Sequence, residues 1–248
     1  MRRLRCLSEA WGAAVRFLTV LPWGRWAADA TPDLGAAAVL FPLVGLLLGA
    51  VMAAVRAAAL ALGSTPCLAA ALSLTGGIAL TGGLHLDGLM DAADGLLGSH
   101  PPKRRLEIMH DARAGAFGVV AVITLLLLKL TALQTAPWQA VVFAPAMGRW
   151  GAALAMAAFP YARSGGLGRM WYDAVGFKQA LLVTGLVAAL LAAAGWWPAW
   201  GLWAWATLLG WAGARWALRR IPGLTGDVYG ALIESLETII LTTAALLL

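Results

Sequence analysis

The sequence is poor in charge: Asp, Glu, Lys and Arg make up only 12% of its 248 residues, against 61% hydrophobic residues. A soluble domain carries about 25% charged residues, so this chain has too few to cover a surface that faces water. Long polar or low-complexity stretches are also missing, which excludes an intrinsically disordered chain. Alternating segments of about ten residues, typical of a membrane β-barrel, do not occur either. These absences leave a helical membrane protein.

Cysteine is scarce as well. Cys6 and Cys67 are the only two, which is too few for a disulfide framework or a cysteine metal site. The formal net charge of +6 would suggest nucleic acid as the partner of a soluble chain, but in a membrane protein such an excess belongs at the cytoplasmic rim. We therefore expect the chain to lie in the lipid bilayer and not to bind nucleic acid.

Seven apolar segments approach the roughly 20 residues that a helix needs to cross a bilayer. They predict an all-α fold, a polytopic integral membrane helical bundle that forms a single membrane domain over residues 1–248. The predicted spans are Leu34–Leu62, Cys67–Leu84, Ala116–Leu133, Trp138–Phe159, Ala180–Trp196, Ala199–Leu218 and Tyr229–Leu248.

The charged residues between these spans indicate how the chain is oriented. Three charged segments alternate with connectors that contain no Lys or Arg, and by the positive-inside rule the charged side and the N-terminus face the cytoplasm. This predicts a multi-pass protein of the cytoplasmic (inner) membrane with its active site on the cytoplasmic side. Acidic residues gather on the same side, which topology does not require, so we attribute them to function. The charged segments are His85–Gly115, Pro160–Gln179 and Arg219–Val228.

The first 33 residues resemble a signal peptide only superficially. Arg16 interrupts the apolar stretch that such a peptide would need before a cleavage site at Ala28-Asp29-Ala30. Polar residues and apolar residues instead fall on opposite faces of a helix. This pattern predicts an N-terminal amphipathic helix in the plane of the interface, within an interfacial segment 1–33.

The densest group of chemically active residues is Gly82-Gly-Leu-His85-Leu-Asp87-Gly-Leu-Met-Asp91-Ala-Ala-Asp94-Gly95. On a helix with about 100° per residue, its three carboxylates project within a ~60° arc over about 10 Å. Like charges at this spacing repel unless something neutralises them, and oxygen ligands favour Mg²⁺ or Mn²⁺ over zinc. We therefore predict a Mg²⁺ site in a segment 85–115, with Asp87, Asp91 and Asp94 as ligands and catalytic residues.

Two other interpretations of this acidic block are weaker. A solvated helix face rarely alternates so completely with Gly, Leu and Met. A cation-coupled transporter would place its carboxylates near the bilayer midplane between broken helices, whereas these lie at one rim.

Asp111 and Arg113 stand directly before a predicted span and add a further carboxylate and a guanidinium. On a helix, side chains two residues apart point in divergent directions. We expect Asp111 to face the metal and Arg113 to pair with a phosphate or another acidic residue.

Arg149 lies near the middle of a span, where an unpaired charge costs at least ~2.5 kcal/mol. It needs a phosphate or a carboxylate, and Glu234 in the last span is a candidate partner. The glycine-rich loop around Arg163 could wrap a phosphate, although it has no P-loop motif. Asp227, near a helix start, is either a site residue or a charge on the helix dipole.

Together these blocks resemble one family, the cobalamin synthases or adenosylcobinamide-GDP ribazoletransferases. The motifs that carry the resemblance are Phe17-Leu-Thr-Val-Leu-Pro22, Phe41-Pro-Leu-Val-Gly45, Gly82–Gly95, Arg105-Leu-Glu-Ile-Met109 with Asp111 to Gly118, Arg149-Trp150, Pro160-Tyr-Ala-Arg163, and Leu224-Thr-Gly-Asp227 with Gly230 and Glu234. The resemblance implies a Mg²⁺-dependent membrane enzyme that joins adenosylcobinamide-GDP to α-ribazole or its 5′-phosphate and releases GMP, late in cobalamin (vitamin B12) synthesis.

For such a reaction, a metal clamps the phosphates, arginines hold the remaining phosphate oxygens, and a carboxylate or His85 accepts the hydroxyl proton. The sequence departs from the family only at Val20, where a basic residue is frequent, and in a short loop after Gly98. The alternatives are a CDP-alcohol phosphotransferase, whose Asp-x-x-Asp-Gly-x-x-Ala-Arg pattern is not matched here, and a cation-coupled transporter. A homo-oligomer is compatible with the sequence.

Overall fold

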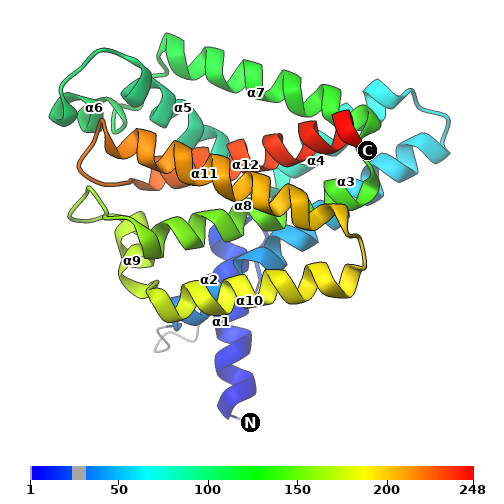
Figure 1. The fold of residues 1–248 in the computed structure, drawn as a ribbon, viewed down its shortest axis with the longest axis horizontal. Coiled ribbons are helices and arrows are strands. Elements are labelled where there is room, and N and C mark those ends of the chain that lie inside the picture. Colours follow the sequence, from blue (N-terminus) through cyan, green and yellow to red (C-terminus); the bar gives the residue numbers. More distant parts are fainter. Residues whose placement is uncertain (1, 24–31) are drawn as a thin grey trace.

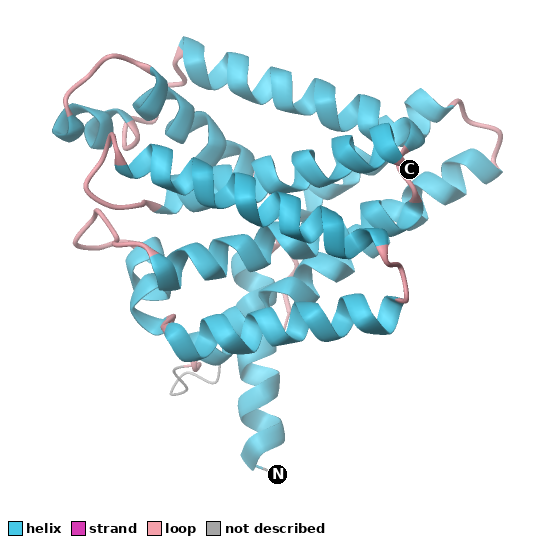
Figure 2. Cartoon of the chain, in the orientation of Figure 1, coloured by secondary structure: helices cyan, strands magenta, loops and turns pink. Residues whose placement is uncertain are grey.

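The structure, a computed structural model, describes residues 2–23 and 32–248, without the side chains of residues 2–5. Over this part the chain is helical and contains no strand, so the all-α prediction is confirmed (Figure 2). The helices are α1 (Arg2–Leu18), α2 (Leu34–Val39), α3 (Phe41–Ala61), α4 (Pro66–Thr81), α5 (Leu84–Leu97), α6 (Pro102–Ile108), α7 (Ala116–Thr135), α8 (Trp138–Ala158), α9 (Leu167–Ala174), α10 (Phe177–Ala194), α11 (Pro198–Leu218) and α12 (Gly226–Leu247).

Long helices lie side by side and form the bundle (Figure 1). The helix α8 is at its centre, because it packs against α3, α10 and α12 and buries most of its residues. The short helices α6 and α9 are both at one end of the bundle, and the connectors without Lys or Arg lie at the other end. This separation of charged and uncharged ends is the arrangement that the sequence predicted for the two membrane faces.

Each of the seven predicted spans is mostly helical, although Leu34–Leu62 divides into α2 and α3, and the spans do not qualify equally as membrane spans. Five of the described helices, α3, α7, α8, α10 and α12, are long and apolar enough to cross a membrane. The pair α4 and α5 makes a sixth if it is taken as one span, broken by a bend of 87°. The helix α11 is also 21 residues long but is not among them.

The bend between α4 and α5 has a local cause. Gly82 and Gly83 both adopt the left-handed conformation, with φ of +62° and +72°, which side chains other than glycine rarely tolerate. They end α4 after Thr81 and start α5 in a new direction. The predicted span Cys67–Leu84 is therefore shorter than expected, and the acidic block turns away from it.

The helix α1 runs across the direction of the long helices, and its N-terminal end projects from the bundle (Figure 1). One face is buried against α2 and α3, through Ala10, Ala14 and Leu18 among others. This orientation fits the predicted interfacial helix. The predicted continuation through Ala28-Asp29-Ala30 lies outside the described residues. Cys67 and Cys6 are exposed free thiols.

Candidate active site

A close crossing of α5 and α12 brings the acidic block to the start of the last helix. The two helices meet at Gly88 and Gly230, where a Cβ atom on Gly88 would lie 3.4 Å from the Cα atom of Gly230. A Cβ atom on Gly88 would lie 3.1 Å from the carbonyl oxygen of Asp227, and one on Gly230 would lie 3.2 Å from that of His85. Larger residues would separate the helices, so the glycines place Asp87 beside Asp227.

The loop after α8 is fixed to the segment before α12 by backbone hydrogen bonds. The Leu224 amide donates to the carbonyl of Pro160 at 2.7 Å, and the Ala162 amide donates to the carbonyl of Leu224 at 2.8 Å. This short pairing sets the position of Arg163, whose Nη2 donates to Asp227 Oδ2 at 2.7 Å and to the carbonyl of Met109 at 3.2 Å. The guanidinium is thereby held at the same point as the carboxylates.

These elements surround a cavity of about 250 Å³, which we call the central cavity. Its polar rim consists of Asp87, Arg163 and Asp227, the buried His85 imidazole lies deeper, and the glycine-rich segment 165–168 forms one side. Burial raises the pKa of Tyr161, which also lines the central cavity, so this hydroxyl remains neutral near pH 7. The deeper wall of the central cavity consists of apolar side chains from α1, α3, α8 and α12: Phe17, Leu18, Phe41, Ala152, Met156 and Ile233.

The helical spacing predicted for the acidic block is confirmed, but its three aspartates do not behave alike. Asp91 lies within electrostatic range of Asp87, Asp94 and Asp227. Asp94, however, accepts hydrogen bonds from the backbone amides of Gly115 and Gly118, both at 2.8 Å. It therefore caps the start of α7 from the neighbouring helix.

This capping changes the predicted metal site. Among the described residues, no group of three His, Cys, Asp or Glu side chains is arranged to hold a metal. Mg²⁺, though, is ordinarily bound by one or two carboxylates together with substrate phosphates. Asp87 and Asp91, one helical turn apart beside Asp227, suit that kind of site, whereas both oxygens of Asp94 already accept hydrogen bonds.

The prediction that Asp111 and Arg113 diverge is wrong. The segment between α6 and α7 is not helical, and the guanidinium folds back onto the carboxylate, with Nε–Oδ1 and Nη2–Oδ2 distances of 3.0 and 2.6 Å. These hydrogen bonds lower the pKa of Asp111 to about 2. The pair is largely exposed and does not line the central cavity.

Arg149 is buried and paired, but not with the residue predicted. Its Nη1 donates to Glu237 Oε1 at 2.5 Å, whereas Glu234 accepts from Lys129 Nζ at 2.6 Å. Lys129 also donates to Glu237 at 2.7 Å. The predicted Arg149–Glu234 pair is therefore wrong by about one helical turn. We call these four residues the charge quartet.

The charge quartet joins α7, α8 and α12 inside the bundle. No side chain of the four is more than 9% exposed, and two positive charges balance two negative ones. It adjoins the central cavity at His85, whose Nδ1 lies 3.5 Å from Arg149 Nη2. Neither Arg149 nor Glu234 lines that cavity.

Sequence reasoning gave no role to Lys129 and Glu237. The sequence does contain a sign that both matter, because each is a charged residue inside an apolar span, where it needs a partner of opposite charge. The aromatic residues Tyr161 and Tyr229, both at the central cavity, were missed too. Isolated aromatic residues carry no such signal.

Comparisons with known proteins place this architecture in a family. The chain matches a family model described as cobalamin-5-phosphate synthase over residues 10–245. It is 40% identical to an adenosylcobinamide-GDP ribazoletransferase of Desulforamulus reducens over 235 residues, which cover 91% of each chain. It is also 40% identical to one of Herpetosiphon aurantiacus, covering 94% of this chain and 95% of the relative.

A relative of the same name from Synechocystis sp. is 37% identical, over 93% of this chain and 92% of the other. No solved structure matches the chain significantly. The sequence aligns with these relatives almost from end to end, and the aligned part includes the crossing of α5 and α12, the acidic block and the charge quartet. The chain therefore belongs to the cobalamin-5-phosphate synthase family.

Proposed function

We propose that the chain is a membrane-embedded transferase that joins adenosylcobinamide-GDP to α-ribazole, or to α-ribazole 5′-phosphate, and releases GMP. Relatives that match nearly the whole chain carry this activity in their names. The observation that carries the proposal is the central cavity, where carboxylates and a guanidinium meet over an apolar wall. Transfer between a diphosphate and a nucleoside needs both kinds of surface.

The reaction exchanges one phosphorus–oxygen bond for another. A hydroxyl oxygen of the ribazole bonds to the phosphorus that carries cobinamide, and the bond from that phosphorus to the bridging oxygen breaks, so that GMP leaves with that oxygen. The hydroxyl proton passes to a carboxylate, for which we propose Asp227 at the rim. We propose Arg163, now paired with Asp227, as the phosphate-binding guanidinium.

We propose Mg²⁺ as the cofactor. Asp87 and Asp91 would hold it together with the diphosphate, since Asp94 is occupied at the start of α7. A bound Mg²⁺ would neutralise the negative charge of the phosphates and of the GMP that leaves. We further propose that the central cavity opens to the cytoplasm and that the protein lies in the cell's cytoplasmic membrane, because the basic loops surround this end of the bundle.

The alternatives fit less well. A cation-coupled transporter would be expected to keep free charges near the midplane, but there the charge quartet is paired and electrically balanced. The CDP-alcohol phosphotransferases share the chemistry, but the family to which the chain belongs is a different one.

The proposal is tested with the purified protein in lipid nanodiscs. Adenosylcobinamide-GDP and α-ribazole are supplied with Mg²⁺, and GMP and the joined corrinoid are quantified by chromatography. We expect both products in equal amounts, no reaction in EDTA, and at least a hundredfold lower turnover for Asp87→Asn. Glu107→Gln serves as the control, because this exposed α6 residue pairs only with Arg104 among the described residues. Hydrolysis of the diphosphate without the joined product would contradict the proposal.

A further inference from the structure

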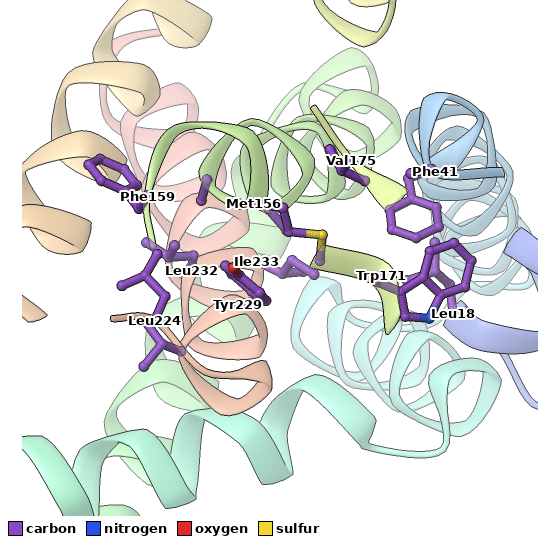
Figure 3. Packing of buried hydrophobic residues seen from close by; sticks show 14 of the residues in the cluster. Leu18, Phe41, Met156, Phe159, Trp171, Val175, Leu224, Tyr229, Leu232 and Ile233 are labelled. Carbon is purple, nitrogen blue, oxygen red and sulfur yellow. The ribbon is translucent and has the colours of Figure 1, made fainter. Parts of the chain in front are cut away.

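The central cavity has two chemically different ends. Carboxylates and the Arg163 guanidinium gather at its rim, and apolar side chains close its depth. Figure 3 shows the buried side chains around that deep end: Met156 of α8 lies beside Tyr229 and Ile233 of α12, and Phe41 of α3 lies farther along, next to Trp171. A ligand that fills the whole cavity therefore has a charged end and an apolar end.

The volume of the central cavity suits a bicyclic aromatic ring. An apolar cavity of roughly 150 Å³ is enough to bind benzene, and the central cavity, with its polar rim included, measures about 250 Å³. Aromatic rings already form part of its wall. Phe17 stacks on Phe41 with their centroids 5.7 Å apart, and Tyr161 lies parallel to Tyr229 at 6.1 Å. Flat walls of this kind favour a flat ligand.

Very few polar groups face the deep end. The Tyr229 hydroxyl is enclosed and has no hydrogen-bond partner in the described part of the chain. The other polar group is the His85 imidazole. The Arg149 guanidinium lies against its Nδ1, and a guanidinium is only a donor. Because the two atoms lie 3.5 Å apart and only the guanidinium can donate, we assign Nδ1 as the acceptor and place the proton of the neutral ring on Nε2.

The two substrates of the proposed reaction differ in their heterocycles. The guanine of adenosylcobinamide-GDP presents an edge of several donors and acceptors, each of which would lose its hydrogen bonds to water in an apolar pocket. The dimethylbenzimidazole of α-ribazole is apolar apart from a single aza nitrogen, which accepts one hydrogen bond. An apolar pocket whose polar groups are one imidazole donor and one tyrosine hydroxyl matches the second ring better than the first.

We propose that the deep end of the central cavity is the subsite for the bicyclic base of the ribazole substrate, and that His85 Nε2–H donates to its aza nitrogen. This inference rests on the proposed function. The diphosphate of the other substrate then lies at the rim, against Arg163 and the carboxylates. His85 is a binding residue in this arrangement, and the charge quartet fixes its tautomer through Arg149.

The first test fills the cavity. Ala152, 1% exposed on α8, lines the deep end, so Ala152→Val takes space from the base. We expect its KM for α-ribazole to rise at least tenfold and its KM for adenosylcobinamide-GDP to change less than twofold. Ala157→Val is the matched control, because it adds the same two methyl groups to the same helix outside the cavity. It should change neither KM.

The second test leaves the protein intact and alters the ligand. In the corresponding dimethylindole riboside, carbon replaces the aza nitrogen. It should bind wild-type protein about five- to tenfold more weakly than α-ribazole in calorimetry, because one neutral hydrogen bond is lost. The difference should disappear in His85→Leu. Equal binding of the two ribosides to wild type would overturn the assignment of His85.

The outcomes separate this inference from the function on which it rests. A wild-type protein that releases no GMP refutes the proposed function. A wild-type protein that releases GMP, with an Ala152→Val variant whose KM rises for adenosylcobinamide-GDP instead of α-ribazole, refutes only the base subsite and assigns the deep end to guanine.

Discussion

The charge quartet can be tested by unbalancing it and then restoring its balance. Lys129→Met leaves Glu234 and Glu237 with Arg149 as the one cation among the four, so a buried carboxylate loses its partner. Breaking a buried ion pair from one side costs about 3–5 kcal/mol, whereas removing both partners together is often close to neutral. Glu234→Gln should destabilise the protein for the same reason, except that the charge quartet then carries one unpaired positive charge.

The double variant Lys129→Met/Glu234→Gln keeps the two charges of Arg149 and Glu237 and is electrically balanced. We expect it to be more stable than the sum of its single variants by about 1–3 kcal/mol. Unfolding by SDS in mixed micelles, followed through the fluorescence of the 13 Trp residues, measures all three. Lys178→Met, an exposed change at the start of α10, should have no effect. Strict additivity of the two quartet substitutions would refute the network.

Three further predictions address the site and the topology. Asp94→Ala removes both hydrogen bonds to the start of α7 and should lower stability in the SDS titration by about 1–2 kcal/mol; an unchanged curve would argue against the capping role. Gly88→Val inserts a side chain between α5 and α12 and should reduce GMP release at least tenfold. The control Gly185→Val, whose side chain extends into open space on α10, should not reduce it. Equal activities of the two variants would mean that the crossing of α5 and α12 does not position the carboxylates. Reporter fusions after Gln134 and after Arg169 should report opposite sides of the membrane, and the same side for both would overturn the predicted orientation.

The parts of the fold that follow from chemical pattern were predictable. Apolar segments of bilayer length gave the long helices, and the spacing of Asp87, Asp91 and Asp94 gave the helix α5. The bend before α5 was not predicted, although Gly82 and Gly83 mark it. Two glycines allow a left-handed turn, but the sequence does not say whether the chain takes it.

The pairing of side chains could not be predicted, because it depends on how helices far apart in sequence meet. Glu234 and Glu237 lie on one face of α12. Which of them Arg149 contacts depends on how α12 is rotated against α8, and in the structure it is Glu237. Asp94 likewise turned to α7 only because that helix begins next to it. The Asp111–Arg113 pair depended on a local turn where the sequence suggested a helix.

The central claim is that the central cavity carries out the transfer with Mg²⁺ held at Asp87 and Asp91. The most direct measurement is GMP release from adenosylcobinamide-GDP and α-ribazole by the purified protein in nanodiscs, titrated with Mg²⁺ for wild type, Asp87→Asn, Asp91→Asn and Asp94→Asn. The account predicts saturable Mg²⁺ dependence in wild type, turnover near zero in the first two variants, and substantial turnover in Asp94→Asn. Loss of turnover only in Asp94→Asn, or wild-type turnover that persists in EDTA, would contradict it.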